Sequence, residues 1–290
     1  MNGRALRASI NETEVGTLQE VAGLWSFQYS ADWLGHPRSF ALSPHLPLTD
    51  ESLLDGATRR PVQWYFDNLL PEEGQRVLLA GDAKLDAADA FGLLAWYGAE
   101  SAGSVTLLPL DAAPQTAEPL RPLPDDALDD RIRQLPKAPL THAAIKRMSL
   151  AGAQHKLAVV LQDGALFEPP GATPSTHILK PDHPDETYRH SVINEWFTMR
   201  LARRLGLDVP AVHRRYVPSP VYLVDRFDRI REGQGWQRRH VIDACQLLGL
   251  DRSFKYSQGN MENLAALANA CRSRAVARYR LFGWLVFNVL

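Results

Sequence analysis

The sequence predicts an α+β fold, with a mixed amino-terminal subdomain and a second lobe in which strands precede long helices. Short runs that alternate apolar and polar residues, which are typical of half-buried strands, occur in both halves of the chain. Apolar residues at helical spacing lie between these runs and dominate the carboxyl-terminal region. Residues 109–139 separate the two parts and contain seven prolines. A chain of 290 residues is long enough for two modest domains, each with its own core.

The composition predicts a cytoplasmic globular protein. Lys+Arg total 32 and Asp+Glu total 33, so the net charge is close to zero and does not by itself attract nucleic acid or a membrane surface. The only cysteines, Cys245 and Cys271, are too few for a disulfide framework and fit a reducing compartment. The start lacks a signal-peptide core. The apolar run 281–290 is about half the ~20 residues needed to cross a bilayer, so we expect a buried core helix there.

The amino-terminal subdomain is expected to span residues 1–110. Asn11-Glu12 indicates a hairpin turn between two strands. Pro71 ends a helix, because proline lacks the amide proton and disfavours helix at the preceding residue. Strands are expected at Ala5–Ile10, Val15–Leu18, Trp25–Tyr29 and Ser104–Leu108, and helices at Pro61–Leu70, Glu72–Ala80 and Asp86–Tyr97.

A proline-rich and acidic connector is expected at 111–147, with a short helix at Asp125–Leu135. The second lobe then covers 148–290. Its clearest helix is Ser191–Leu205, with apolar residues at helical spacing and Gly206 as the stop. Strands are expected at Leu157–Leu161, Ala165–Phe167, around Ile178 and at Val221–Val224, and helices at Val241–Leu248 and Met261–Leu290, the latter broken near 271–275.

A loop of small residues opens the second lobe. Ala151, Gly152 and Ala153 let backbone amides approach an anion, and Lys156 adds a positive charge. The loop matches neither a dinucleotide-binding nor a P-loop pattern, so a hairpin entry with a convenient glycine explains it equally well.

Lys180 strengthens the case for an anion site. In a strand, Thr176, Ile178 and Lys180 share one face, and a lysine among apolar neighbours must reach solvent or find a partner. The candidate partner is Glu195, early in the helix that follows. A strand lysine paired with a helix glutamate is the arrangement with which protein kinases hold ATP phosphates. A lysine that reaches solvent and a solvated glutamate are the alternatives.

A third segment follows the strand at Val221–Val224. In the kinase interpretation, Arg226, Phe227 and Asp228 pass along the adenine ring, with backbone groups at the ring edge and Phe227 near the apolar base pocket. The alternative for the charged residues is a surface ion pair of Asp228 with Arg226 or Arg229, worth about 0–1 kcal/mol.

Together these segments resemble the HipA family of serine/threonine kinases, the toxin half of a bacterial toxin–antitoxin pair. The resemblance covers nearly the whole chain, and the order of the segments makes it specific. It rests on Leu42–Leu48, Tyr65–Pro71, Gly103–Leu107, Ser149–Lys156, Asn194-Glu195, Leu201-Ala202 and Leu205–Leu207.

The resemblance implies a kinase-like small lobe that binds ATP with Mg²⁺. Ser149 would be the serine that family members autophosphorylate, which places about −1.5 to −2 charge beside a loop meant for anions. The implied nucleotide-binding residues are Ala151, Gly152, Ala153, Gln154, His155, Lys156, Lys180, Asp225, Arg226 and Phe227.

Three departures from the family pattern stand out. His155 and Asp225 occupy positions where glutamate is common in the family. Both replacements would be tolerated if backbone atoms, and not these side chains, contact the nucleotide. The catalytic aspartate and asparagine, and the aspartate that holds magnesium, have no counterpart, since no acidic residue follows Glu262. We therefore expect a truncated HipA-like chain, with only the start of the helical large lobe, no catalytic or metal-binding residue of its own and no kinase activity.

Two functions remain open, and a third, an ATP-grasp or unrelated transferase, is disfavoured. The first is a kinase whose complete form acts on a translation-related protein such as an aminoacyl-tRNA synthetase. Its implied partner is a HipB-like helix-turn-helix antitoxin, through which DNA is contacted only indirectly. The second is a non-catalytic nucleotide- or partner-binding module from a degraded or split HipA system.

Overall fold

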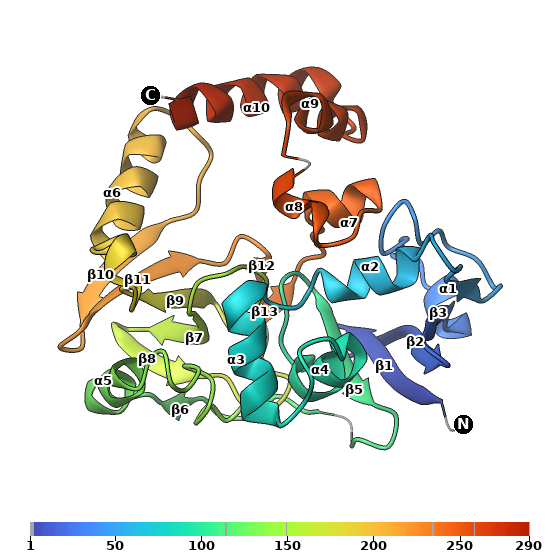
Figure 1. The fold of residues 1–290 in the computed structure, drawn as a ribbon, viewed down its shortest axis with the longest axis horizontal. Helices are drawn as coiled ribbons and strands as arrows, with labels where there is room; N and C mark the ends of the chain where they lie inside the picture. The colour runs from blue at the N-terminus through green and yellow to red at the C-terminus, as the bar shows by residue number, and fades with distance from the viewer. Residues whose placement is uncertain (1–2, 114, 149, 234, 258, 290) are drawn as a thin grey trace.

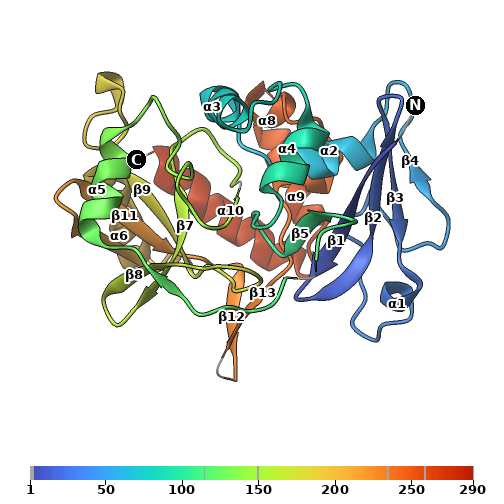
Figure 2. The same ribbon diagram turned by 90° about the horizontal axis from the view of Figure 1, so that it is seen from below.

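The predicted α+β class is confirmed. A computed structural model describes residues 3–113, 115–148, 150–233, 235–257 and 259–289. Two sheet-based units lie side by side, and the last helices lie along one side of both (Figure 1). Figure 2 shows the same units from below, with the carboxyl-terminal helix crossing behind them from the second unit toward the first. No helix among the described residues is long and apolar enough to cross a membrane.

The first unit is a five-stranded antiparallel sheet in the order β4-β3-β2-β1-β5, with helices beside it. Asn11 and Glu12 both have positive φ, which is the backbone of a two-residue type I′ hairpin. Leu6, Phe27 and Phe66 are fully buried in its core. Its elements are β1 (Arg4–Ile10), β2 (Thr13–Val21), β3 (Leu24–Tyr29), α1 (Ala31–Leu34), β4 (Leu53–Leu54), α2 (Pro61–Asp67), α3 (Glu73–Ala83), α4 (Ala90–Tyr97) and β5 (Val105–Pro109).

The second unit is a six-stranded sheet in the order β10-β11-β9-β7-β8-β6. Leu128 of α5 joins Leu157, Leu179 and Leu223 in one core, so α5 covers the face on which these strand residues lie. Its elements are β6 (Arg121–Pro122), α5 (Asp125–Arg133), β7 (Leu157–Gln162), β8 (Ala165–Glu168), β9 (His177–Pro181), the 3₁₀ turn η1 (Glu186–Tyr188), α6 (Ser191–Arg204), β10 (Val212–Tyr216) and β11 (Pro220–Asp225).

The segment 111–147 packs into this second core. It supplies the edge strand β6 and the helix α5, and Leu123, Leu128 and Leu140 are buried with the sheet. A stretch with the composition of a connector is therefore a structural part of the second unit.

The last part of the chain returns to the first unit. It comprises the hairpin β12 (Arg229–Glu232) and β13 (Gly235–Arg238), followed by α7 (Ala244–Leu248), α8 (Phe254–Ser257), α9 (Met261–Asn269) and α10 (Arg274–Val289). The helix expected from Val241 begins only at Ala244, because the Asp243 side chain caps it in a capping box. Gln246 Nε2 donates to the carbonyl of Tyr65, which fastens α7 to α2.

The expected break between the last two helices is confirmed, but the expectation of a buried helix at 281–290 is wrong for the residues described. No residue of α10 is buried, and Tyr279 is 79% exposed. The apolar residues of α6 at Ile193, Phe197 and Leu201 are also exposed. Helical periodicity locates an amphipathic face but does not supply the surface that covers it.

Candidate nucleotide-binding site

The loop before β7 folds over its own lysine. Lys156 Nζ donates to the carbonyl of Ala151 at 2.6 Å. Gly152 has φ +107° and forms a parallel bridge with Pro71, and a Cβ there would lie 2.7 Å from Lys156 Nζ. Only glycine combines this backbone conformation with room for the lysine head.

The ion pair expected between Lys180 and Glu195 is present. Lys180 Nζ lies 2.7 Å from Glu195 Oε2 and also donates to Gln154 Oε1 at 2.7 Å. The pair is about a quarter exposed, and Lys180 Nζ lies 5.9 Å from the Tyr222 ring centroid on the neighbouring strand. The side chain of Gln154 therefore ties the loop to β9 and α6, a contact that its place in a small-residue loop did not predict.

The two lysine heads create a positive, partly desolvated site. Burial, together with the charge of Lys180, lowers the pKa of Lys156 to about 8. Such a pair of amines is stabilised by an anion placed between them.

His155 lies beside these lysines and is neutral at pH 7. Burial, with the charges of His183 and Lys156, lowers its pKa to about 4. Its Nε2 lies 3.2 Å from Gln75 Nε2 of α3, and its Nδ1 is buried without a partner among the described residues. With Gln75 donating, the ring proton sits on Nδ1, which leaves an unused donor next to the loop.

A cleft of about 680 Å³ opens beside the loop, between the two units. Gln75 and Leu78 of α3 form one wall, Gln154 and His155 of the loop form another, and Tyr188 of η1 lies across from them. The amino-terminal unit thus contacts the loop. Neither Lys156 nor Lys180 lines this cleft, and the segment Asp225–Phe227 does not line it either, so the cleft lies next to the two lysines.

The structure separates the side chains of Asp225, Arg226 and Phe227. Asp225 contacts His177 and His213 on the sheet face opposite Lys180. Phe227 is 68% exposed. The Arg226 side chain is 1% exposed and pairs with Asp228 at 2.6 Å, so the surface ion pair considered for these residues is wrong: the pair is buried.

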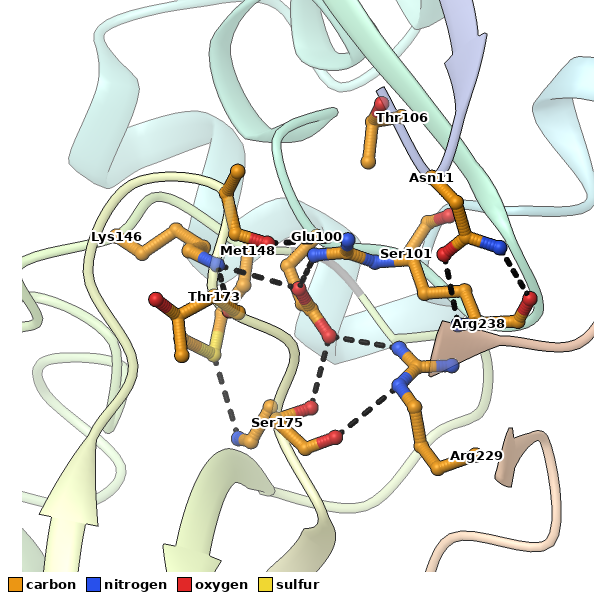
Figure 3. Close-up of polar contacts among 12 residues, drawn as sticks. Asn11, Glu100, Ser101, Thr106, Lys146, Met148, Thr173, Ser175, Arg229 and Arg238 are labelled. Carbon is orange, nitrogen blue, oxygen red and sulfur yellow. Dashed lines mark hydrogen bonds and ion pairs between the residues drawn. The ribbon is translucent and has the colours of Figure 1, made fainter. Parts of the chain in front are cut away.

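A buried ionic cluster centred on Glu100 joins the two units, as Figure 3 shows for Lys146, Arg229 and Arg238. Arg226 belongs to the same cluster. Glu100 lies between α4 and β5 and is fully buried. Its carboxylate meets Arg229 at 2.7 Å, Arg238 at 2.8 Å, Arg226 at 3.2 Å and Lys146 at 3.4 Å. Ser175 Oγ donates to the same carboxylate. Lys146 and Ser175 come from the second unit, and the three arginines come from the segment that follows β11.

The charges in this cluster are strongly coupled. Burial alone would raise the pKa of Glu100, but Arg238, Lys146, Arg229 and Arg226 together hold it well below its usual value. Burial lowers the pKa of Lys146 to about 8. Sequence patterns did not reveal this cluster, because Glu100 and its partners lie 46 to 138 residues apart.

Ser149 lies outside the described residues, so its surroundings are not part of the site geometry.

Comparisons with known proteins place the chain among characterised relatives. The model of the HipA N-terminal domain matches residues 6–108, and that of the HipA-like C-terminal domain matches residues 148–290. The serine/threonine-protein kinase toxin HipA of Shewanella oneidensis is 31% identical over 98% of this chain and 68% of its own length. Y4mE of Sinorhizobium fredii is 38% identical over 82% of this chain and 57% of its own.

A solved structure shows the same architecture. HipA in a Shewanella oneidensis complex of HipA, HipB and operator DNA superimposes with a TM-score of 0.78 at 29% identity, over 98% of this chain and 68% of that one. The chain spans between about half and two thirds of the length of these relatives. Identity along nearly the whole chain, two domain matches in the same order and a shared fold lead to one conclusion: this chain belongs to the HipA family.

Proposed function

We propose that this chain carries the nucleotide-binding part of a HipA-family serine/threonine protein kinase, which binds ATP beneath the loop 151–156. The observation that carries the proposal is the contact of Lys180 with both Glu195 and Gln154. It joins the loop, the strand and the helix that hold phosphates in protein kinases. The phosphoryl acceptor proposed for the kinase is a serine or threonine of a translation-related protein such as an aminoacyl-tRNA synthetase.

The residues present fit a polyphosphate. Lys156 and Lys180 supply two positive charges, Gly152 permits close backbone approach, and His155 offers a further donor at Nδ1. Bound ATP, with its Mg²⁺, supplies the phosphoryl group, and these side chains hold and orient its phosphates. Release of Lys156 from the Ala151 carbonyl would free its head for that role.

The adenine is assigned to the backbone of Asp225–Phe227. Asp225 pairs with His177, three residues before Lys180 on β9, or roughly 10 Å along the strand. The amides of Asp225 and Arg226 already donate to the carbonyls of Ala211 and Thr176. Among these three residues, the Phe227 backbone is therefore the expected contact to the ring edge.

The partner and regulation follow from the relatives. A HipB-like helix-turn-helix antitoxin is proposed because the structural relative is a complex of HipA with HipB and operator DNA. DNA would be reached through that antitoxin, in the cytoplasm. Phosphorylation of Ser149, two residues before the loop in the sequence, would add a negative charge and compete with ATP phosphates.

A second candidate is a non-catalytic module that keeps nucleotide and partner binding. The observation in its favour is that the contacts of Lys180 with Glu195 and Gln154 can hold a nucleotide without any catalytic carboxylate. Both candidates require the same nucleotide site.

Calorimetric titration with ATP tests that site. Lys180→Ala removes a charge-assisted contact and should weaken binding by about 1.5–3 kcal/mol. Arg38→Ala is the control, since Arg38 is an exposed cation of the amino-terminal unit that does not line the cleft beside the loop. Equal ATP affinity in the wild-type and Lys180→Ala chains would overturn the assignment.

A further inference from the structure

A cluster of two histidines and one aspartate lies on the sheet of the second unit, on the face away from the nucleotide cleft. The Nε2 atoms of His177 and His213 lie 3.0 Å and 3.2 Å from the same Oδ1 of Asp225. These donor atoms all fall within 4.8 Å of one another. No role in the nucleotide site uses these three side chains together.

The strand register brings the three residues to one place. Asp225 of β11 is the direct partner of His177 on β9. His213 of β10 is the direct partner of Leu223, two residues before Asp225. Side chains two apart on a strand, and direct partners on adjacent strands, point to the same face. Lys180, an odd number of residues from His177, points to the other face, toward Glu195.

We propose that His177, His213 and Asp225 form a binding site for a divalent transition metal of the zinc class. Two imidazole nitrogens and one carboxylate oxygen are ligands typical of zinc sites that keep an open coordination position. The donor separations of 3.0 Å and 3.2 Å are compatible with ligands about 2.0–2.2 Å from one shared ion. Hard cations such as Mg²⁺ prefer oxygen ligands and are excluded by the two imidazoles.

The surroundings of the cluster support this assignment. Thr176 Oγ1 lies 2.7 Å from Nδ1 of His177, and such outer partners commonly orient a metal-binding imidazole with its other nitrogen toward the metal. The His177 side chain is 13% exposed, while those of His213 and Asp225 are about half exposed. Solvent can thus deliver an ion and complete its coordination. A bound ion would join β9, β10 and β11 at one end of the sheet.

The test is a zinc titration of the full 290-residue chain by calorimetry, with a chromophoric chelator as competitor. A Cys271→Ser background removes the exposed thiol, which could bind zinc by itself. We expect one zinc per chain. His213→Ala and Asp225→Asn should each weaken binding by at least about tenfold.

Two matched controls separate this site from a general surface effect and from the nucleotide cleft. His142 is exposed and contacts Asp82, an imidazole–carboxylate pair like one half of the cluster. His142→Ala and Lys180→Ala should leave zinc affinity unchanged. Absence of stoichiometric zinc binding would overturn the proposal, as would equal affinity in the wild-type and His213→Ala chains or an equal loss in His142→Ala.

Discussion

The Nζ atom of Lys180 lies 2.7 Å from Oε2 of Glu195, and the same Nζ lies 2.7 Å from Oε1 of Gln154. One ammonium group therefore links a central strand, the helix beside it and the loop above. Glu195 holds the lysine head in place while no anion is bound. A phosphate that approaches Lys180 must then share it with the Glu195 carboxylate.

Glu195→Gln should therefore strengthen the binding of inorganic tripolyphosphate by up to about fivefold, the equivalent of about 1 kcal/mol for a partly exposed pair. The amide keeps the size of the side chain but no longer competes by charge. Calorimetry with tripolyphosphate measures the effect. Lys180→Ala should change affinity in the opposite direction, and a loss of affinity in both variants would contradict the competition.

Polyphosphate affinity should fall as the pH rises above about 8. The pKa of Lys156 is lowered to about 8, mainly by burial and then by the charge of Lys180. A bound anion favours the ammonium form and raises that pKa, so binding takes up a proton once Lys156 is neutral in the free chain. Affinity should be level below pH 8 and fall by up to about tenfold per pH unit above it.

Lys156→Arg supplies the control, because arginine stays charged throughout this range. Its affinity should show no decline between pH 8 and 9.5 when measured beside the wild type. The same decline in both chains would assign the pH dependence to another group.

Local patterns were sufficient to predict much of this fold. Alternation in Trp25–Tyr29 and the helix ahead of Gly206 depend on residues close in sequence, and β3 and α6 are present there. The helix expected at Pro61–Leu70 is present as α2, but it ends at Asp67, before Pro71. The pairing of Lys180 with Glu195 could also be predicted, because only 15 positions separate the two residues in the sequence.

The contacts that lacked a local signal depend on long-range packing. Glu100 stands in an ordinary loop in the sequence, and its partner Arg238 is 138 residues away. His177 and His213 come together only when the strand register is known. For α10 the local signal was present but misleading. Its apolar content predicted burial, whereas the described residues offer no surface that covers it.

Glu100→Gln should destabilise the protein by about 3–5 kcal/mol, because it leaves buried cations without their shared counter-charge. Urea unfolding at pH 7 measures the loss. The pKa of Glu100 is lowered in the folded state, so its contribution is present in full above the usual value of 4.5 and is lost as the pH falls further toward the folded pKa. The variant should therefore lose less stability than the wild type below pH 4.5.

Glu51→Gln is the matched control for that substitution, since Glu51 is exposed in a loop. It should change the free energy of unfolding by no more than about 0.5 kcal/mol. A wild-type-like midpoint in Glu100→Gln would show that the cluster contributes nothing net to stability.

The 290 residues alone should transfer no phosphate from ATP. Phosphoryl transfer needs a carboxylate that orients the acceptor hydroxyl and others that hold the metal. No acidic residue follows Glu262, while Glu195 is paired with Lys180 and Glu72 with Lys255. Incubation with γ-labelled ATP and Mg²⁺, followed by intact-mass analysis, measures transfer, with Shewanella oneidensis HipA as the positive control. Label that appears on the wild-type chain but not on the Ser149→Ala chain would contradict this prediction. It would show that the chain phosphorylates itself without an acidic residue after Glu262.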